Sequence, residues 1–217
     1  MKIPTTIHLE NLDAVLLSPQ SSEVVRFKVT IPVYGSDDRM LAPLYAELLE
    51  RGTKSKTRKQ FTEALETLGA HISIASGQCG ITVAGTALSR TFETFLTVIA
   101  EMLREPIFNE KEMTQVHTHA LQALDDERDN ARLLAYNEFT HLLYPKDHPY
   151  YRPTPAKRRA FLKSVTRKTY LDFHQKLFAT KISLSISDAK TAQKSLLDLF
   201  SSLIQTPDVI PPVMPIV

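Results

Sequence analysis

The sequence predicts an α+β domain in which an antiparallel β-sheet is covered on one face by helices. Residues 25–33 alternate apolar and polar side chains with the period of two that a half-buried strand requires. A helical period replaces this alternation from residue 41, and two further alternating segments stand at 71–76 and 81–86. Because strands and helices are mixed without regular strand–helix–strand alternation, the pattern favours antiparallel strands over a parallel sheet.

Composition and charge narrow the function classes. The formal charge is +2, which gives no reason to expect a nucleic acid or a membrane as partner. Cys79 is the only cysteine, so an internal disulfide and a cysteine-based metal cluster are excluded. The start of the chain has no apolar signal-peptide core, and no run approaches the roughly 20 apolar residues that span a bilayer. We therefore expect a soluble chain, periplasmic or cytoplasmic if bacterial, with the compartment left open.

The domain organisation is expected to be simple. A chain of 217 residues can form one domain of the larger kind without a disulfide or metal to stabilise it. Residues 1–206 are interpreted as a single domain. Residues 207–217 are rich in proline and are interpreted as a tail or as the start of an extended linker.

The first third of the chain begins with strands. Two short strands are expected on either side of a turn at Asn11, followed by the strand at 25–33. The helix after it carries its apolar residues on one face, and Gly52 stands where a C-terminal cap is expected.

The segments that follow carry clear boundary signals. Thr57 and Gln60 have the spacing of a capping box that opens a second helix, and Gly69 is expected to end it. A hairpin follows, with strands at 71–76 and 81–86. The remaining elements are expected to be helices near 89–104, 109–128 and 131–144, one or two short helices before 178, a strand at 182–186 and a helix near 189–204.

Four segments resemble the pitrilysin/insulinase metallopeptidase family, in the family's order and spacing. They cover roughly residues 7–205 together. They are Ala46-Glu-Leu-Leu-Glu-Arg-Gly-Thr53, the Phe61–Ala70 helix with the hairpin after it, Arg104-Glu-Pro-Ile-Phe108 with an acidic helix start, and Arg128-Asp-Asn130 followed by His148-Pro-Tyr150. The resemblance implies one half of the family's duplicated architecture, which is normally paired with a second, similar half.

The residues that the family uses for catalysis are missing. Active members carry His-x-x-Glu-His on the helix before the Gly-Thr turn, where two histidines bind zinc and the glutamate serves as base. Alignment on that turn places Pro43 and Glu47 at the ligand positions and Ala46 at the base. The family's third ligand, a glutamate, falls on Leu121 or Gln122. The resemblance therefore predicts no catalytic residue, no metal and no cofactor in this chain.

The remaining histidines and basic segments give little evidence for another metal site or binding site. His117 and His119 are two residues apart on a helix and point in different directions, so one is expected to pack and one to be exposed. His141 and His148 flank a turn and could approach each other. The basic segments 51–59 and 157–168 are expected to be solvated, with an acidic peptide or partner surface as the alternative.

The sequence leads to two functional hypotheses. In the first, the chain is a non-catalytic domain that pairs with a zinc-bearing sister domain or subunit to form a peptide-processing chamber. In the second, it is a structural or assembly subunit that handles no peptide. For the first, the hairpin is expected to offer a strand edge to peptide or to a second copy of the chain. The edge residues are Ile72, Ile74, Ile81 and Val83.

Overall fold

A computed structural model describes residues 5–9, 12–17, 23–78, 80–187 and 192–203. The predicted turn at Asn11, Cys79, the first residues of the helix near 189–204 and the tail at 207–217 lie outside the described residues. Among the residues described, no helix combines the length and apolar character needed to cross a bilayer.

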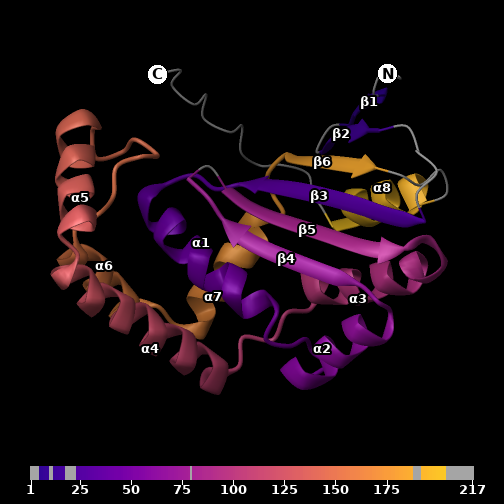
Figure 1. Ribbon diagram of the computed structural model, residues 1–217, viewed down its shortest axis with the longest axis horizontal. Helices are drawn as coiled ribbons and strands as arrows, with labels where there is room; N and C mark the ends of the chain where they lie inside the picture. Colours follow the sequence, from indigo (N-terminus) through magenta and orange to yellow (C-terminus); the bar gives the residue numbers. More distant parts are fainter. Residues whose placement is uncertain (1–4, 10–11, 18–22, 79, 188–191, 204–217) are drawn as a thin grey trace.

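One six-stranded sheet forms the centre of the molecule (Figure 1). Its order is β1-β2-β6-β3-β5-β4. The strands are β1 (Thr5–His8), β2 (Leu12–Leu16), β3 (Val24–Pro32), β4 (His71–Ser76), β5 (Gly80–Leu88) and β6 (Ile182–Ser187). Every pairing is antiparallel except β2 with β6, which is parallel. The expectation of a purely antiparallel sheet is therefore corrected at this one pairing.

The α-helices lie on one side of the sheet and at one end of it (Figure 1). They are α1 (Ser36–Leu49), α2 (Arg58–Thr67), α3 (Phe92–Arg104), α4 (Glu110–Asp126), α5 (Ala131–Leu143), α6 (Pro155–Ser164), α7 (Arg167–Leu177) and α8 (Ala192–Leu203). Short 3₁₀ turns precede α3 at Ser89–Thr91 and follow α4 at Glu127–Asp129. The α+β class and the covering of one sheet face are confirmed.

The alternation along β3 determines which face is covered. Val25, Phe27, Val29 and Ile31 are buried, while Arg26 and Lys28 between them are exposed. Gly85, on the neighbouring β5, lets aromatic rings lie against the strand, because an added Cβ there would lie 2.5 Å from the ring of Phe27 and 2.8 Å from that of Phe95. The core therefore forms between this face of the sheet and the helices.

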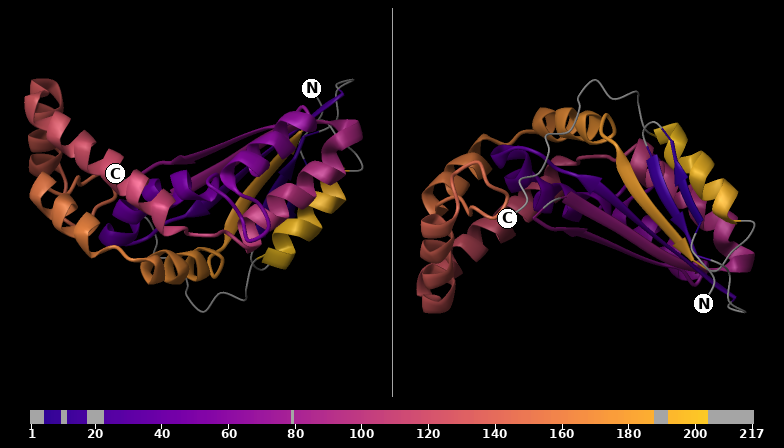
Figure 2. Two further views of the ribbon diagram at one scale, coloured as in Figure 1. Left: turned by 90° about the horizontal axis from the view of Figure 1, so that it is seen from below. Right: turned by 90° about the horizontal axis from the view of Figure 1, so that it is seen from above.

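The chain is curved, and its two ends differ in construction (Figure 2). Helix α8 lies at one end, against α3 and under the sheet, and α5 stands at the other end, away from the strands. Helices α4 and α6 connect this outer helix to the rest of the domain. We call α4, α5 and α6 the wing.

The helix boundaries confirm most of the predicted signals. Thr57 and Gln60 form a complete capping box, and Gly69 has a φ of 59° just after α2. The prediction that Gly52 caps the preceding helix is wrong. Helix α1 already ends at Leu49 with Glu50 as its cap, and Gly52, with a φ of 131°, belongs to the turn that pairs with Thr57. An added Cβ at Gly52 would lie 2.9 Å from the carbonyl oxygen of Lys56, so this turn requires glycine.

Candidate functional site

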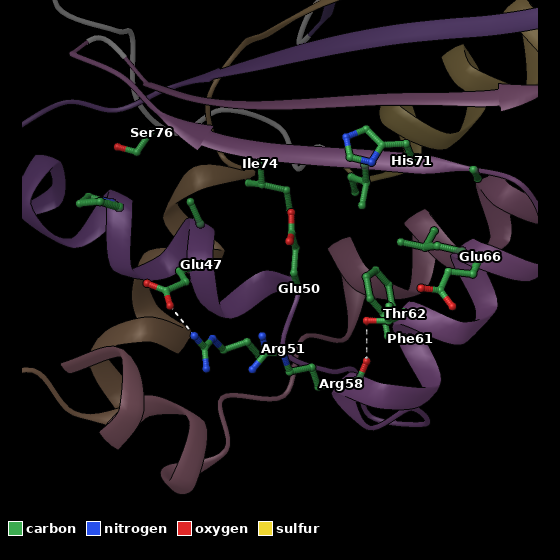
Figure 3. A pocket seen from close by; sticks show the side chains of 15 residues that line it. Glu47, Glu50, Arg51, Arg58, Phe61, Thr62, Glu66, His71, Ile74 and Ser76 are labelled. Atoms are coloured by element: carbon green, nitrogen blue, oxygen red, sulfur yellow. Dashed lines mark hydrogen bonds and ion pairs between the residues drawn. The ribbon is translucent and has the colours of Figure 1, made fainter. Parts of the chain in front are cut away.

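Two hollows meet on the outer side of α1. The first encloses about 620 Å³ between α1, α2 and β4 (Figure 3). The second encloses about 820 Å³ between α1, α4, the loop at 149–153 and α6. Because both are lined by Pro43, Glu47 and Ser76, they form one continuous groove that crosses the face of α1. We call this the α1 groove.

The groove passes over the positions that the sequence assigned to the missing zinc motif. Pro43 and Glu47, one helical turn apart, both point outward and line both hollows, whereas Ala46 is buried. Proline at 43 cannot donate the backbone hydrogen bond of a mid-helix residue, yet α1 continues through it. Of these three positions, only Glu47 offers an atom that could bind a metal.

The carboxylate of Glu47 is already engaged. It accepts a hydrogen bond from Arg51, four residues later and just beyond the end of α1, and the two form an ion pair (Figure 3). Arg51 also donates to Glu112 at 2.8 Å and to Gln115 at 3.2 Å, both on α4. The guanidinium group, whose side chain is only 8% exposed, therefore joins α1 to α4 beside the groove. Burial lowers the pKa of Arg51, but its carboxylate partners outweigh this and raise it, so the charge is retained.

The third ligand position supplies no carboxylate. Leu121 packs against the hydrophobic core, and Gln122 is exposed on α4. Within the described ranges, no three histidine, cysteine, aspartate or glutamate side chains are grouped so that they could hold a metal ion. A catalytic zinc uses three protein ligands, so the side chains present do not fit the family's metal.

The hollow beside β4 carries both acidic and basic groups. Glu47, Glu50 and Glu66 line it, as do Arg58 and His71. The side chain of Glu50 extends from the end of α1 toward Ile74 on β4 (Figure 3). Burial raises the pKa of Glu50, although the backbone of Ile74 and the charges of His71 and Arg58 oppose this. The hollow can therefore contact both signs of charge on a bound chain.

The predicted strand edge is only partly correct. Strand β4 is the last strand of the sheet, and its Ile72 and Ile74 line the hollow. Strand β5 lies inside the sheet, between β3 and β4, and its Ile81 and Val83 are 0% exposed. The assignment of Ile81 and Val83 to the edge is therefore wrong, because alternation alone does not tell an inner strand from an outer one. Binding of peptide at β4 stays a prediction.

The Gly-Thr turn after α1 is tied to α3. Glu101 accepts hydrogen bonds from the hydroxyl groups of Thr53 and Ser55 and from the ammonium group of Lys56. Burial raises the pKa of Glu101, but these donors outweigh it and lower the pKa to about 2. The turn is thus fixed against the domain by a partly buried carboxylate, which also holds Lys56, just before α2, in place.

The histidines have structural roles. His117 bonds the hydroxyl of Tyr170 at 2.8 Å, and His119 is exposed at the groove, as their spacing on α4 predicts. His141 bonds the carbonyl oxygen of Arg152 at 2.7 Å. His148 stacks with Tyr144, with ring centroids 4.4 Å apart. The candidate pair His141 and His148 thus fixes the loop after α5 by separate contacts.

The basic segments do not form an open cationic patch. Lys56 and Lys59 pair with Glu101 and Glu63, and Arg51 with Glu47 and Glu112. In the second segment the ion pairs are Lys157–Asp37, Arg158–Glu127, Arg159–Asp125 and Lys168–Asp172. The interpretation as surface or structural charges is therefore favoured over recognition of an acidic partner.

Several residues of the site were not identified from the sequence. Glu112, Gln115 and Glu101 complete the contacts behind the groove, and Ser76 stands where its two hollows meet. The spacing of Glu47 and Arg51, four residues apart on a helix, was the available signal for the first ion pair. No local pattern marks the others, because their partners lie more than 40 residues away.

The geometry agrees with a comparison against protein families. The model of the insulinase family, peptidase family M16, matches residues 41–153, which is more than half of the chain. The chain belongs to this family. The matched range contains α1 from residue 41 onward, the β4–β5 hairpin and the wing as far as the loop before α6, so it includes most of the α1 groove.

Relatives within family M16 are longer than this chain. An uncharacterized zinc protease of Rickettsia felis is 27% identical over 174 residues, which is 78% of this chain and 42% of that protein. A second, from Rickettsia bellii, is 28% identical over 71% of this chain and 38% of its own length. The chain thus spans about two fifths of the curated relatives it matches.

Solved structures share the fold. The peptidase M16 inactive domain from Pseudomonas fluorescens superposes with a TM-score of 0.84 and 18% identity, over 96% of this chain and 52% of that one. A protease from Helicobacter pylori gives 0.73 and 15%, over 100% of this chain and 53% of that one. The periplasmic protease PqqL from Escherichia coli gives 0.76 and 11%, over 98% and 24%.

Proposed function

We propose that this chain is a non-catalytic M16 domain that pairs with a zinc-bearing sister domain and supplies one wall of a peptide-processing chamber. The observation that carries the proposal is the α1 groove. It is open and about 1.4 thousand Å³ in its two parts taken together, yet the zinc positions it passes over hold Pro43, Ala46 and Glu47. An open groove without metal ligands can bind a peptide but cannot hydrolyse it by the zinc mechanism of the family.

The arrangement of β4 supports a peptide as the occupant. An extended peptide can add to an unpaired sheet edge through its backbone while alternate side chains enter adjoining pockets. Strand β4 is such an edge within the described part of the sheet, and Ile72 and Ile74 face the hollow beside it. The acidic and basic lining would contact a peptide through either sign of charge.

The alternative is a structural or assembly subunit. In favour of this alternative, the ion pairs beside the groove join elements of the domain to one another. The clearest example is Arg51 with Glu112, which links the end of α1 to α4. A peptide-binding wall needs the groove to stay open, whereas a structural subunit does not. The effect of blocking the groove on peptide hydrolysis by the pair therefore separates the two functions.

The first test concerns the metal and uses the chain alone. After dialysis against micromolar zinc, metal analysis should find no stoichiometric ion, and peptidase assays should show no hydrolysis. The triple variant Pro43→His, Ala46→Glu, Glu47→His should also stay inactive, because Leu121 or Gln122 cannot supply the third ligand. Chelator-sensitive hydrolysis by that variant would contradict the assigned ligand positions.

The second test blocks the groove in the paired state. Thr62 and Thr67 are both exposed on α2, and each hydroxyl donates to the carbonyl oxygen four residues earlier. Only Thr62 lines the groove. With the His-x-x-Glu-His chain of the same organism as partner, Thr62→Trp should raise the KM for peptide about tenfold, which corresponds to about 1.4 kcal/mol.

Thr67→Trp is the matched control and should leave the KM unchanged. If the pair forms and both variants hydrolyse peptide like the unsubstituted pair, the groove handles no peptide and the structural alternative is supported. If no pair forms at all, the proposed function fails at its first step.

A further inference from the structure

Helix α5 exposes most of its large apolar side chains and buries two polar ones. Its two buried side chains are those of Asn137 and Thr140. Its large apolar side chains are exposed instead, with Phe139 at 55% and Leu142 at 86%. Leu134, Tyr136 and Leu143 are exposed as well. This is the reverse of the pattern by which a surface helix packs on its own domain.

The angular positions on the helix confirm the reversal. At about 100° per residue, Asn137 and Thr140 lie roughly 60° apart and define the inner side. Phe139 and Leu142, also about 60° apart, lie on the other side of the helix. Leu143 lies about 40° beyond Phe139, and Leu134 and Tyr136 lie at the two flanks. Together these residues form one broad surface, which also carries Arg132 and Glu138 and which we call the outer face of α5.

The inner side is fully occupied by the domain itself. The carboxylate of Glu127, 3% exposed, accepts from Asn137 on α5, from Arg158 at 2.6 Å and from Arg152 at 3.2 Å. This buried cluster fixes α5 to the loop after it and to α6. Because α5 is held from its polar side, the apolar outer face does nothing for the packing of this domain.

The surroundings of the outer face favour a protein partner. Tyr150, 42% exposed, lies in the loop beyond α5 and adjoins Tyr144 with ring centroids 5.6 Å apart, so a further aromatic side chain is accessible at this end of the wing. Arg152, Arg158 and Arg159, in the loop after α5 and on α6, are paired with Glu127 and Asp125. The outer face itself carries one charge of each sign, Arg132 and Glu138, so it offers a polyanion no excess of positive charge, whereas an apolar protein surface would bury large aromatic and aliphatic side chains.

We infer that the outer face of α5 is the surface on which the zinc-bearing sister domain docks. The inference rests on the proposed function and adds the place of contact. Solved chains of this fold carry about as much further polypeptide as they share with this chain, since the match covers 96–100% of this chain but 52–53% of theirs. A partner of domain size therefore accompanies the fold in those chains.

A second copy of the chain fits the outer face less well. Helix α5 has 13 residues and is about 20 Å long, at 1.5 Å per residue. Two such helices meeting side by side fall short of the roughly 1,200–2,000 Å² that a stable interface buries. A projecting helix that enters a concave partner is covered on more of its sides, and α5 projects at the end of the molecule (Figures 1 and 2).

The experiment measures binding of the full chain to the purified His-x-x-Glu-His chain of the same organism, by calorimetry and by sedimentation. Phe139→Glu with Leu142→Glu should weaken binding at least 100-fold, and Leu142→Glu alone at least tenfold. Leu142→Met should bind like the unsubstituted chain. Leu171→Glu is the matched control, because Leu171 is an exposed leucine on α7, outside the wing, and it should leave binding unchanged. Circular dichroism and thermal unfolding verify that each variant is folded.

The outcomes separate this inference from the proposed function. If the unsubstituted chain binds the zinc-bearing chain and the α5 variants bind equally well, the docking surface is wrong while the pairing stands. If the unsubstituted chain does not bind at all, the pairing itself fails. If the chain forms dimers that the α5 variants dissociate, the occupant is a second copy and the inference is overturned.

Discussion

Helices α3 and α5 each contain 13 residues, but they bury opposite kinds of side chain. Helix α3 buries seven apolar side chains, among them Phe92, Phe95 and Met102, under the sheet. Helix α5 buries an asparagine and a threonine and exposes its phenylalanine and three of its four leucines. In α3 the apolar side chains stabilise the domain, whereas in α5 they are available to something outside it.

The polar contacts of the two helices show the same contrast. Glu101, on α3, is partly exposed, and its carboxylate fixes the Gly-Thr turn. Under α5, the buried carboxylate of Glu127 and its two arginine partners make the contact that apolar side chains make under α3. Within the described residues, Oδ1 of Asn137 is a buried side-chain oxygen without a hydrogen-bond partner. The inner side of α5 is thus a costly way to attach a helix, and a domain that used α5 only for its own packing would gain more from an apolar contact.

The strongest way to test the comparison is to remove one phenylalanine from each helix. Phe95 is 0% exposed and lies against Phe27 and Phe92, so Phe95→Ala should lower the free energy of unfolding by about 3–5 kcal/mol. Phe139→Ala on α5 should change it by no more than about 0.5 kcal/mol. Urea unfolding measures both. Equal losses would mean that α5 is packed like α3 and that its outer face is part of the domain.

A smaller effect is expected from the buried cluster under α5. Glu127→Ala leaves Arg158 and Arg152 without their carboxylate partner, which should cost about 3 kcal/mol or somewhat less, because both arginines are partly exposed. Hydrogen exchange should show faster opening of α5 than of α3. Arg159→Ala is a control, since its partner Asp125 is exposed, unlike the buried Glu127, and the pair should matter little. Uniform destabilisation of both helices would show that the wing is not a separate unit.

The smallest effect concerns the carboxylate on α3, and it depends on pH. The pKa of Glu101 is lowered to about 2 from an ordinary value of 4.5, so its stabilisation is complete above pH 4.5 and is lost as the pH falls toward 2. Glu101→Gln should therefore lower the free energy of unfolding by roughly 2 kcal/mol at neutral pH. The difference between the two proteins should vanish near pH 2. A constant difference from pH 7 to pH 2 would assign the loss to packing.

Local signals in the sequence predicted most of the fold. The alternation in β3, the capping box at Thr57 and the stop at Gly69 each depend on residues near one another in the chain, and the structure confirms them. The parallel pairing of β2 with β6 was missed, since it joins segments about 170 residues apart. The role of Gly52 was misread because a cap and a tight turn place the same demand on glycine.

The candidate site was predictable only where the family motif covers it. The expectation that the zinc ligands are lost rests on aligning Pro43 and Glu47 on the Gly-Thr turn, and it stays a prediction. The alignment does not show that Arg51 reaches Glu112, or that β5 is an inner strand, because both depend on the tertiary arrangement. For the same reason, the polarity of α5 could not be seen in its sequence, since Glu127, Arg152 and Arg158 determine which side faces inward.

The link between α1 and α4 has a consequence for the conditions in which this domain keeps its shape. A zinc ion that joins two helices can be withdrawn by a chelator or by a zinc-poor environment. The bridge from Glu47 through Arg51 to Glu112 is made only of side chains, and the guanidinium does not release its proton at any physiological pH. The groove beside that bridge should therefore keep the same form whether metal is scarce or plentiful.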